Sequence, residues 1–224
     1  MARLLIKFPT RQRPDLFKRT VQTYVDNLAD PENTRFLFTF DTDDTTMERE
    51  WVDPFLASLG VGYTRRWGVS KSKVDAINRD LNEYDYPWDI LLLASDDMLP
   101  NVHGYDNLIR QQFEVNGPDH LLWINDGKQD KICTIACMDR EYYLRDGYIY
   151  RPAPDGYLSL YCDNEQQEVA KIRGRLLMAP NWITNECFVW KGSIPNDALY
   201  RRNNRHHRTD ERTYRQRQRA GFPA

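Results

Sequence analysis

Short apolar runs alternate with amphipathic stretches along the first 95 residues. Runs rich in Leu, Ile, Phe and Val predict strands, and apolar residues near a 3.6-residue period predict helices. The predicted strands are residues 3–9, 35–40, 61–66 and 89–95. The predicted helices are residues 13–28, 47–59 and 70–84. This alternation predicts an α/β fold with a central, mostly parallel sheet flanked by helices.

The second half of the chain is less regular, and no linker divides it from the first. We expect helices at 105–113, 139–147 and 162–175, the last starting at an Asp/Asn cap. We expect strands at 120–125, 131–138, 175–180 and 182–190. The segment after residue 200 has few apolar residues, so we expect a mobile arm or one that only a ligand orders. The predicted organisation is one domain over 1–200, with halves 1–100 and 101–200, and a tail over 201–224.

The mean hydropathy of −0.74 is typical of a soluble globular protein. No apolar run approaches the roughly 20 residues that span a membrane, and the N-terminus does not resemble a signal peptide. We therefore expect a cytoplasmic protein. The four cysteines form no C-x-x-C pair and are expected to be buried free thiols (Cys133, Cys137, Cys162 and Cys187).

Charge is unevenly distributed along the chain. Eight of the 31 basic residues but only two of the 33 acidic ones lie between residues 201 and 219. That segment therefore carries about +6, and the rest of the chain about −8. An arginine cluster of this kind predicts polyanion binding, and the alternative is an ordinary solvated C-terminus. The candidate polyanion-binding residues are Arg201, Arg202, Arg205 and Arg208.

Polar clusters follow three of the predicted strands: "PTRQR" from Pro9, "DTDD" from Asp41 and "SDD" from Ser95. The carboxyl ends of parallel strands meet at one edge of a sheet, where ligands bind. Asp96 and Asp97 are adjacent, and two carboxylates about 5 Å apart repel by roughly 3 kcal/mol at an effective dielectric of about 20. Either solvent or a divalent cation offsets this repulsion.

The motifs of several nucleotide-binding and hydrolytic enzymes do not occur in the sequence. "GVSKSK" lacks the spacing of the Walker phosphate loop, and no G-x-G-x-x-G or G-x-S-x-G is present. These absences disfavour a P-loop NTPase, a Rossmann dinucleotide enzyme and an α/β-hydrolase.

Four segments, in order, resemble the GT-A fold glycosyltransferases of family 2. "FPTRQRP" resembles the loop that holds the nucleotide base, "DTDD" the acidic group at the base and ribose, "SKSKVDAIN" a stretch that approaches the nucleotide, and "SDDM" the metal-binding D-x-D. The resemblance implies a nucleotide-sugar donor, such as UDP-sugar or another NDP-sugar. The implied donor-binding residues are Pro9, Thr10, Arg11, Asp41, Asp43, Asp44, Lys73, Asn78 and Ser95.

The resemblance also implies a metal and a catalytic base. Mn²⁺ or Mg²⁺ would be held by Asp96 and Asp97, although Ala94 stands where the family has its first Asp, and Glu186 occupies the place of a family His. "SLYCDNEQQEVAKIRGRL" resembles the helix with the catalytic carboxylate, so Asp163 is the first candidate base and Glu165 the second. One base implies inversion of the sugar's configuration.

The acceptor is the least determined part. The sequence is similar to small phage-encoded members of the family, which implies a hydroxyl acceptor such as a hydroxymethylated pyrimidine in DNA. A cell-surface glycan or lipid-linked sugar is the alternative within the family. Outside it, a nucleotidyltransferase would need a Gly- and Lys-containing loop after the first strand, and "FPTRQRP" has neither. A non-enzymatic nucleic-acid-binding protein also remains open; the sequence does not indicate an oligomeric state.

Overall fold

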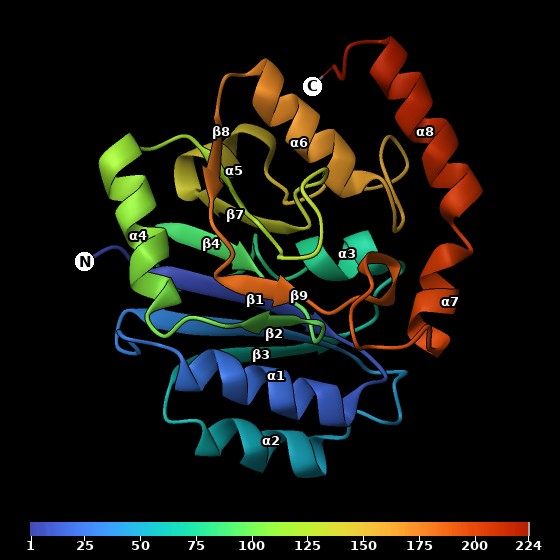
Figure 1. Ribbon diagram of the computed structural model, residues 1–224. Coiled ribbons are helices and arrows are strands. Elements are labelled where there is room, and N and C mark those ends of the chain that lie inside the picture. Colours follow the sequence, from blue (N-terminus) through green and yellow to red (C-terminus); the bar gives the residue numbers. More distant parts are fainter. Residues whose placement is uncertain (224) are drawn as a thin grey trace.

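A seven-stranded sheet runs through the molecule in the order β3-β2-β1-β4-β7-β6-β8 (Figure 1). The computed structural model describes residues 1–223. Every neighbouring pair is parallel except the two that involve β7. The strands are Leu4–Thr10 (β1), Thr34–Asp41 (β2), Gly62–Gly68 (β3), Ile90–Leu93 (β4), Leu121–Ile124 (β6), Ile135–Asp139 (β7) and Leu176–Ala179 (β8). The α/β prediction with a mostly parallel sheet is confirmed.

A second, two-stranded sheet pairs Met98–Pro100 (β5) with Ile183–Asn185 (β9) in antiparallel fashion. The residue before β5 is Asp97, whose carbonyl accepts the N–H of Glu186 at 2.7 Å. This small sheet therefore ties the segment after β4 to the C-terminal part of the chain.

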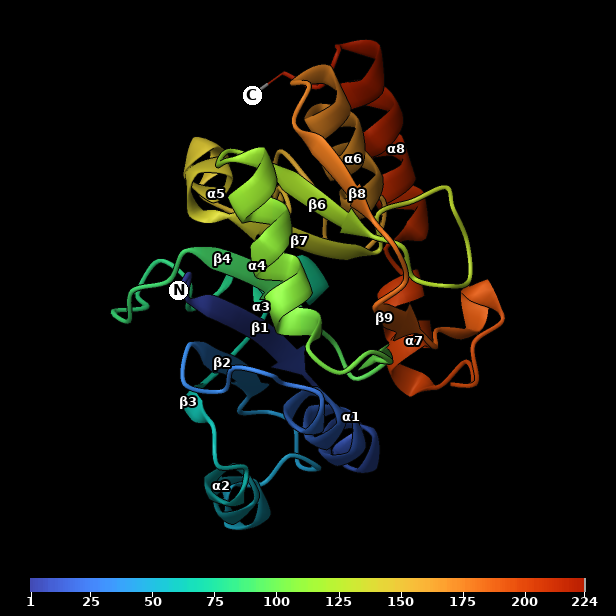
Figure 2. The same ribbon diagram turned by 60° about the vertical axis from the view of Figure 1, so that its left-hand side comes forward.

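Helices cover both faces of the large sheet, as Figures 1 and 2 show. One apolar cluster joins the sheet to α1, α2 and α4, and a second joins it to α3, α5 and α6. The helices are Pro14–Asp26 (α1), Arg49–Ser58 (α2), Lys73–Asn78 (α3), Tyr105–Asn116 (α4), Arg140–Asp146 (α5), Cys162–Ile172 (α6), Ala198–Asn204 (α7) and His207–Arg219 (α8), with a short 3₁₀ helix at Phe188–Trp190 (η1).

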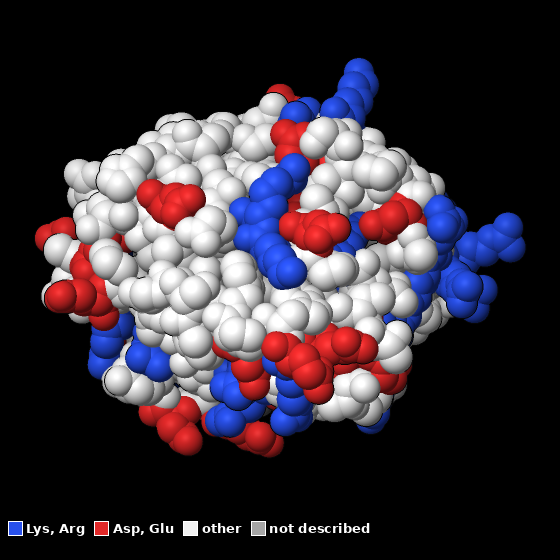
Figure 3. All heavy atoms as spheres, turned by 90° about the horizontal axis from the view of Figure 1, so that it is seen from below, with Lys and Arg blue, Asp and Glu red and all other residues white. Residues whose placement is uncertain are grey.

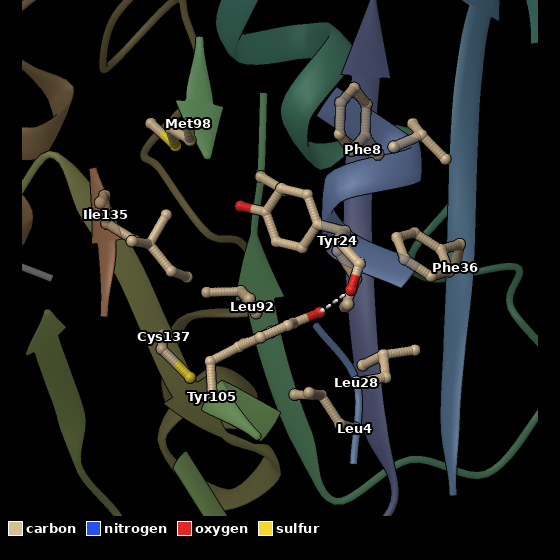
Figure 4. Close-up of a cluster of buried hydrophobic side chains, with 14 of the residues drawn as sticks. Leu4, Phe8, Tyr24, Leu28, Phe36, Leu92, Met98, Tyr105, Ile135 and Cys137 are labelled. Atoms are coloured by element: carbon tan, nitrogen blue, oxygen red, sulfur yellow. Dashed lines mark hydrogen bonds between the residues drawn. The ribbon is translucent and has the colours of Figure 1, made fainter. Parts of the chain in front are cut away.

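The core follows from strand alternation. Leu4 and Phe8 of β1 pack in the α1 cluster, whereas Leu5 packs in the α3 cluster. Tyr24 and Tyr105 lie at the centre of the α1 cluster (Figure 4), where the Tyr105 hydroxyl donates to the Tyr24 carbonyl at 3.4 Å. Aromatic rings meet edge to face around them, an arrangement that favours close packing.

Several expectations about local structure are wrong. The third helix ends at Asn78 instead of Tyr84, and 182–190 divides into β9 and η1. Helix α6 begins at Cys162, and its N-cap is Tyr161 in a left-handed conformation, so no Asp or Asn side chain caps it. The C-terminal segment was expected to be a mobile arm or one that only a ligand orders; in the structure, residues 198–204 and 207–219 form α7 and α8.

The cysteines are free, as expected, and three of the four are buried while Cys187 is partly exposed. Among the described residues, none of the helices has the length and apolar character that a membrane crossing requires.

Candidate functional site

The polar clusters after β1 and β2 meet at one edge of the sheet, as predicted. Arg11 donates to Asp41 at 2.9 Å and to both oxygens of Asp43, at 2.5 and 2.9 Å. The other oxygen of Asp41 accepts the backbone N–H of Ser70, which follows β3, at 2.9 Å. Residues after three parallel strands therefore form one polar surface with two carboxylates and a guanidinium.

Not every predicted donor-binding residue presents a free group at this edge. Asp44 accepts the Gln12 N–H at 2.7 Å and both donors of Thr46, so it shapes the loops. Thr10 is 7% exposed, and its hydroxyl has no partner among the described residues. Pro9 precedes it, partly exposed, in β1.

The structure gives Asn78 a structural position. Its amide nitrogen donates to the Tyr150 carbonyl at 2.6 Å, and its amide oxygen accepts the N–H groups of Ile149 and Tyr150 at 2.9 and 3.2 Å. Both ends of the side chain are therefore engaged by backbone. We assign Asn78 to holding the loop before α6.

Asp96 and Asp97 follow the central strand β4, and protein groups already engage both carboxylates. Asp96 is 3% exposed and accepts from Arg13 at 2.6 Å. Asp97 is 8% exposed and accepts from the hydroxyl of Tyr200 at 2.6 Å and from that of Ser95. Burial raises the pKa of Asp96 to about 7, even though Arg13 opposes the shift.

Helix α7 supplies the groups that close over these carboxylates. Arg13 pairs with its N-cap residue Asp197 at 2.7 and 3.0 Å, and the guanidinium lies 4.1 Å from the centre of the Tyr200 ring. No residue of α7 is buried, so these polar contacts attach it to the body. The sequence did not single out Arg13, Asp197 or Tyr200; the only signal was the place of Arg13 within "PTRQRP".

The three predicted metal ligands do not form a metal site in this arrangement. Glu186 is paired with Lys128 at 3.0 Å and accepts the Ser193 N–H at 2.7 Å. Across residues 1–223 there is no group of three or more His, Cys, Asp or Glu side chains placed to hold an ion. Because Asp96 and Asp97 are also engaged, the donor set does not fit Mn²⁺ or Mg²⁺ as the side chains stand. Metal use stays a prediction.

The two candidate bases on α6 have opposite environments. Within the described chain, the only hydrogen bond to the Asp163 carboxylate comes from the N–H of Asn164 at 3.0 Å. Burial raises the pKa of Asp163, and Lys73 partly offsets this. Glu165, in contrast, is 4% exposed and accepts from Tyr157 at 2.6 Å and from Arg217 at 3.0 and 2.8 Å.

Lys73 is the first residue of α3. Desolvation acts to lower the pKa of Lys73, but the coulombic effect of Cys162, followed by those of Asp163 and Asp97, outweighs this and raises it. A raised pKa favours the charged ammonium group of Lys73, and its side chain is exposed. An exposed, charged lysine is a group that attracts anionic ligands.

The predicted polyanion-binding arginines are divided between two helices. Arg201 donates to the Asn196 carbonyl at 2.7 Å, and Arg202, on the same helix α7, is partly exposed. Arg205 lies between the helices and Arg208 on α8, both exposed.

No family model matches the chain, and no curated protein matches its sequence. Solved structures match its fold. A mannosyltransferase from Pyrobaculum calidifontis, in complex with GDP-Man and Mn²⁺, has a TM-score of 0.66 at 13% identity, covering 80% of this chain and 55% of that one. This chain thus spans about half of that protein's length.

Glucosyl-3-phosphoglycerate synthase from Mycobacterium tuberculosis, in complex with Mn²⁺, UDP-Glc and phosphoglyceric acid, has a TM-score of 0.63 at 12% identity, covering 100% of this chain and 81% of that one. The fold is the GT-A fold. A cytidylyltransferase from Leptospira borgpetersenii has a TM-score of 0.52 at 13% identity, covering 80% and 75%. The GT-A fold alone therefore does not select between sugar transfer and nucleotidyl transfer.

Proposed function

We propose that this chain transfers a sugar from a nucleoside-diphosphate sugar to a hydroxyl acceptor. The observation that carries the proposal is the carboxylate of Asp163, which accepts one hydrogen bond among the described residues and feels the charge of Lys73. The polar loops with Arg11, Asp41 and Asp43 at the carboxyl ends of the strands support it. A base, a cation for a diphosphate and a polar nucleotide surface are the groups that this reaction needs.

The proposed reaction is a single displacement. Asp163 takes the proton of the acceptor hydroxyl as that oxygen forms a bond to the anomeric carbon. The bond from this carbon to the diphosphate oxygen breaks, and the diphosphate leaves with the electron pair. Lys73 offers positive charge to the leaving group. A raised pKa at Asp163 suits a base that works near neutral pH.

For the acceptor, we propose a hydroxymethylated pyrimidine in DNA, because the C-terminal segment is rich in arginine. A cell-surface glycan or lipid-linked sugar is the competing acceptor. Nucleotidyl transfer is the competing reaction class, because a cytidylyltransferase shares the fold.

The test is thermal unfolding with UDP, GDP, CDP, ADP, dTDP and CTP, each in EDTA and in Mn²⁺. A ligand of the native state stabilises it by about 2.7 kcal/mol at a hundred times its dissociation constant. We expect one nucleoside diphosphate to raise the melting temperature. Lys73→Ala should abolish the shift, and Lys71→Ala, an exposed lysine two residues away, should retain it. A shift with CTP alone would favour nucleotidyl transfer, and no shift with any nucleotide would contradict the proposal.

A further inference from the structure

Helix α8 is fixed to the body through its inner face. Asp210 is 1% exposed, and its carboxylate accepts three successive backbone N–H groups, from residues 158–160, at 2.8 to 3.0 Å. Arg217 pairs with the buried Glu165, and the ring of Tyr214 stacks on Tyr161 at 5.5 Å. The orientation of α8 is therefore defined, and so is the face that it turns outward.

The outward face carries a row of four arginines, named here the arginine face: Arg208, Arg212, Arg215 and Arg219. Their spacing of four, three and four residues places all of them within about 60° around the helix axis. All four are exposed. At a rise of about 1.5 Å per residue, the row is roughly 16 Å long.

Most of the charge on the arginine face is not neutralised. Arg215 pairs with Glu211 at 2.7 Å, while the other three arginines have no ion pair among the described residues. The exposed residues between them are polar, Thr209, Gln216 and Gln218 among them. The opposite situation holds on the face seen in Figure 3, where acidic and basic side chains lie next to one another.

We propose that the arginine face binds the phosphate backbone of a nucleic acid. Each strand of a duplex carries one phosphate per about 3.4 Å, so a row of roughly 16 Å spans about five phosphates of one strand. Guanidinium groups match phosphate oxygens well because they donate two parallel hydrogen bonds. A lipid surface fits less well, because a helix that lies on a membrane needs an exposed apolar side and this face is polar.

The biological use of this surface rests on the proposed DNA acceptor, but the binding itself is independent of sugar transfer. The negative charge of the rest of the chain makes the contribution of the arginine face to binding easier to measure. With about −8 outside the C-terminal segment, the body repels a nucleic acid, so binding should depend on these few arginines.

The experiment is fluorescence anisotropy with a labelled 20-base-pair duplex over a range of salt concentrations. We expect the logarithm of the binding constant to fall with the logarithm of salt concentration, with a slope of about −3 for three to four neutralised phosphates. Arg212→Gln/Arg219→Gln should reduce the steepness by about two units. The control Arg19→Gln/Arg140→Gln removes the same charge from exposed positions on α1 and α5 and should change the slope little.

Two results would overturn the inference: no duplex binding by the wild type, or equal weakening of binding in both double variants. If no duplex binds, the wild type could instead form a salt-sensitive dimer that Arg212→Gln/Arg219→Gln abolishes. Such a dimer would mean that the surface docks on the acidic body of a second copy. The nucleotide-induced thermal shift, measured on the same variants, keeps a failure here distinct from a failure of the proposed transfer.

Discussion

Two acidic pairs in this protein look alike in sequence and differ in structure. Asp96 and Asp97 follow a buried strand, where the pattern most strongly suggests chemistry, yet Arg13 and Tyr200 engage them. Asp163 and Glu165 open a helix, where acids are common, yet Asp163 accepts only one hydrogen bond among the described residues. The partners that the fold brings to a carboxylate, more than its sequence motif, decide whether it is free to react.

Asp163 and Glu165 should differ most in how much they contribute to the rate of sugar transfer. Asp163→Asn should lower the rate of sugar transfer by about 10²- to 10⁴-fold, the usual contribution of a general base, without changing the melting temperature much. The measurement is the rate with the donor identified by thermal shift. If Asp163→Asn retains the wild-type rate, the free carboxylate is not the base.

For the free energy of unfolding, Glu165 should matter more than Asp163. Glu165→Gln should lower the free energy of unfolding by about 3 kcal/mol, because it leaves the guanidinium of Arg217 without its charged partner. The control is Glu168→Gln on the same helix, which breaks only an exposed pair with Lys171 and should cost less than about 1 kcal/mol. Urea unfolding measures the free energy of unfolding of both variants. Equal losses in Glu165→Gln and Glu168→Gln would contradict a structural role of the buried Glu165.

The contribution of Asp96 to stability should depend on pH. The pKa of Asp96 in the folded protein, about 7, lies above that of an unfolded Asp, so the folded state binds more protons between about pH 4 and 7. Its contribution to stability therefore falls as the pH rises through that window. We expect the stability difference between wild type and Asp96→Asn to change by at least about 1.4 kcal/mol, the equivalent of one pKa unit. A difference independent of pH would contradict the shift.

The smallest expected effect on stability comes from the hydrogen bond between Tyr200 of α7 and Asp97. Tyr200→Phe removes the hydrogen bond to Asp97 and should lower the free energy of unfolding by about 1 kcal/mol. Hydrogen exchange should also become faster in α7, because few other contacts hold this helix. Tyr86→Phe, at an exposed tyrosine, serves as the control. Unchanged exchange would show that Tyr200 does not hold α7 in place.

The sequence predicted the first half of the fold well because its signals are local. Apolar runs such as residues 35–40 and periodic stretches such as 13–28 report strands and helices directly, and the rule for parallel sheets then placed Arg11 near Asp41. The pairing of Arg13 with Asp197 joins residues 184 positions apart, which no periodicity encodes.

The C-terminal helices were missed for a different physical reason. Helix α8 is anchored by a buried carboxylate, Asp210, and by the ion pair of Arg217, so it lacks the apolar stripe by which a packed helix is recognised. The backbone partners of Asn78 could not be predicted either, because its residue type does not show whether an amide binds backbone or a ligand.

The configuration of the transferred sugar tests the central claim most directly. If Asp163 is the only base and the reaction is a single displacement, proton NMR of the fresh product should show the anomer opposite to that of the donor. Retention of the donor's configuration would contradict the account, because a single displacement in which the acceptor attacks opposite the leaving diphosphate inverts the anomeric carbon.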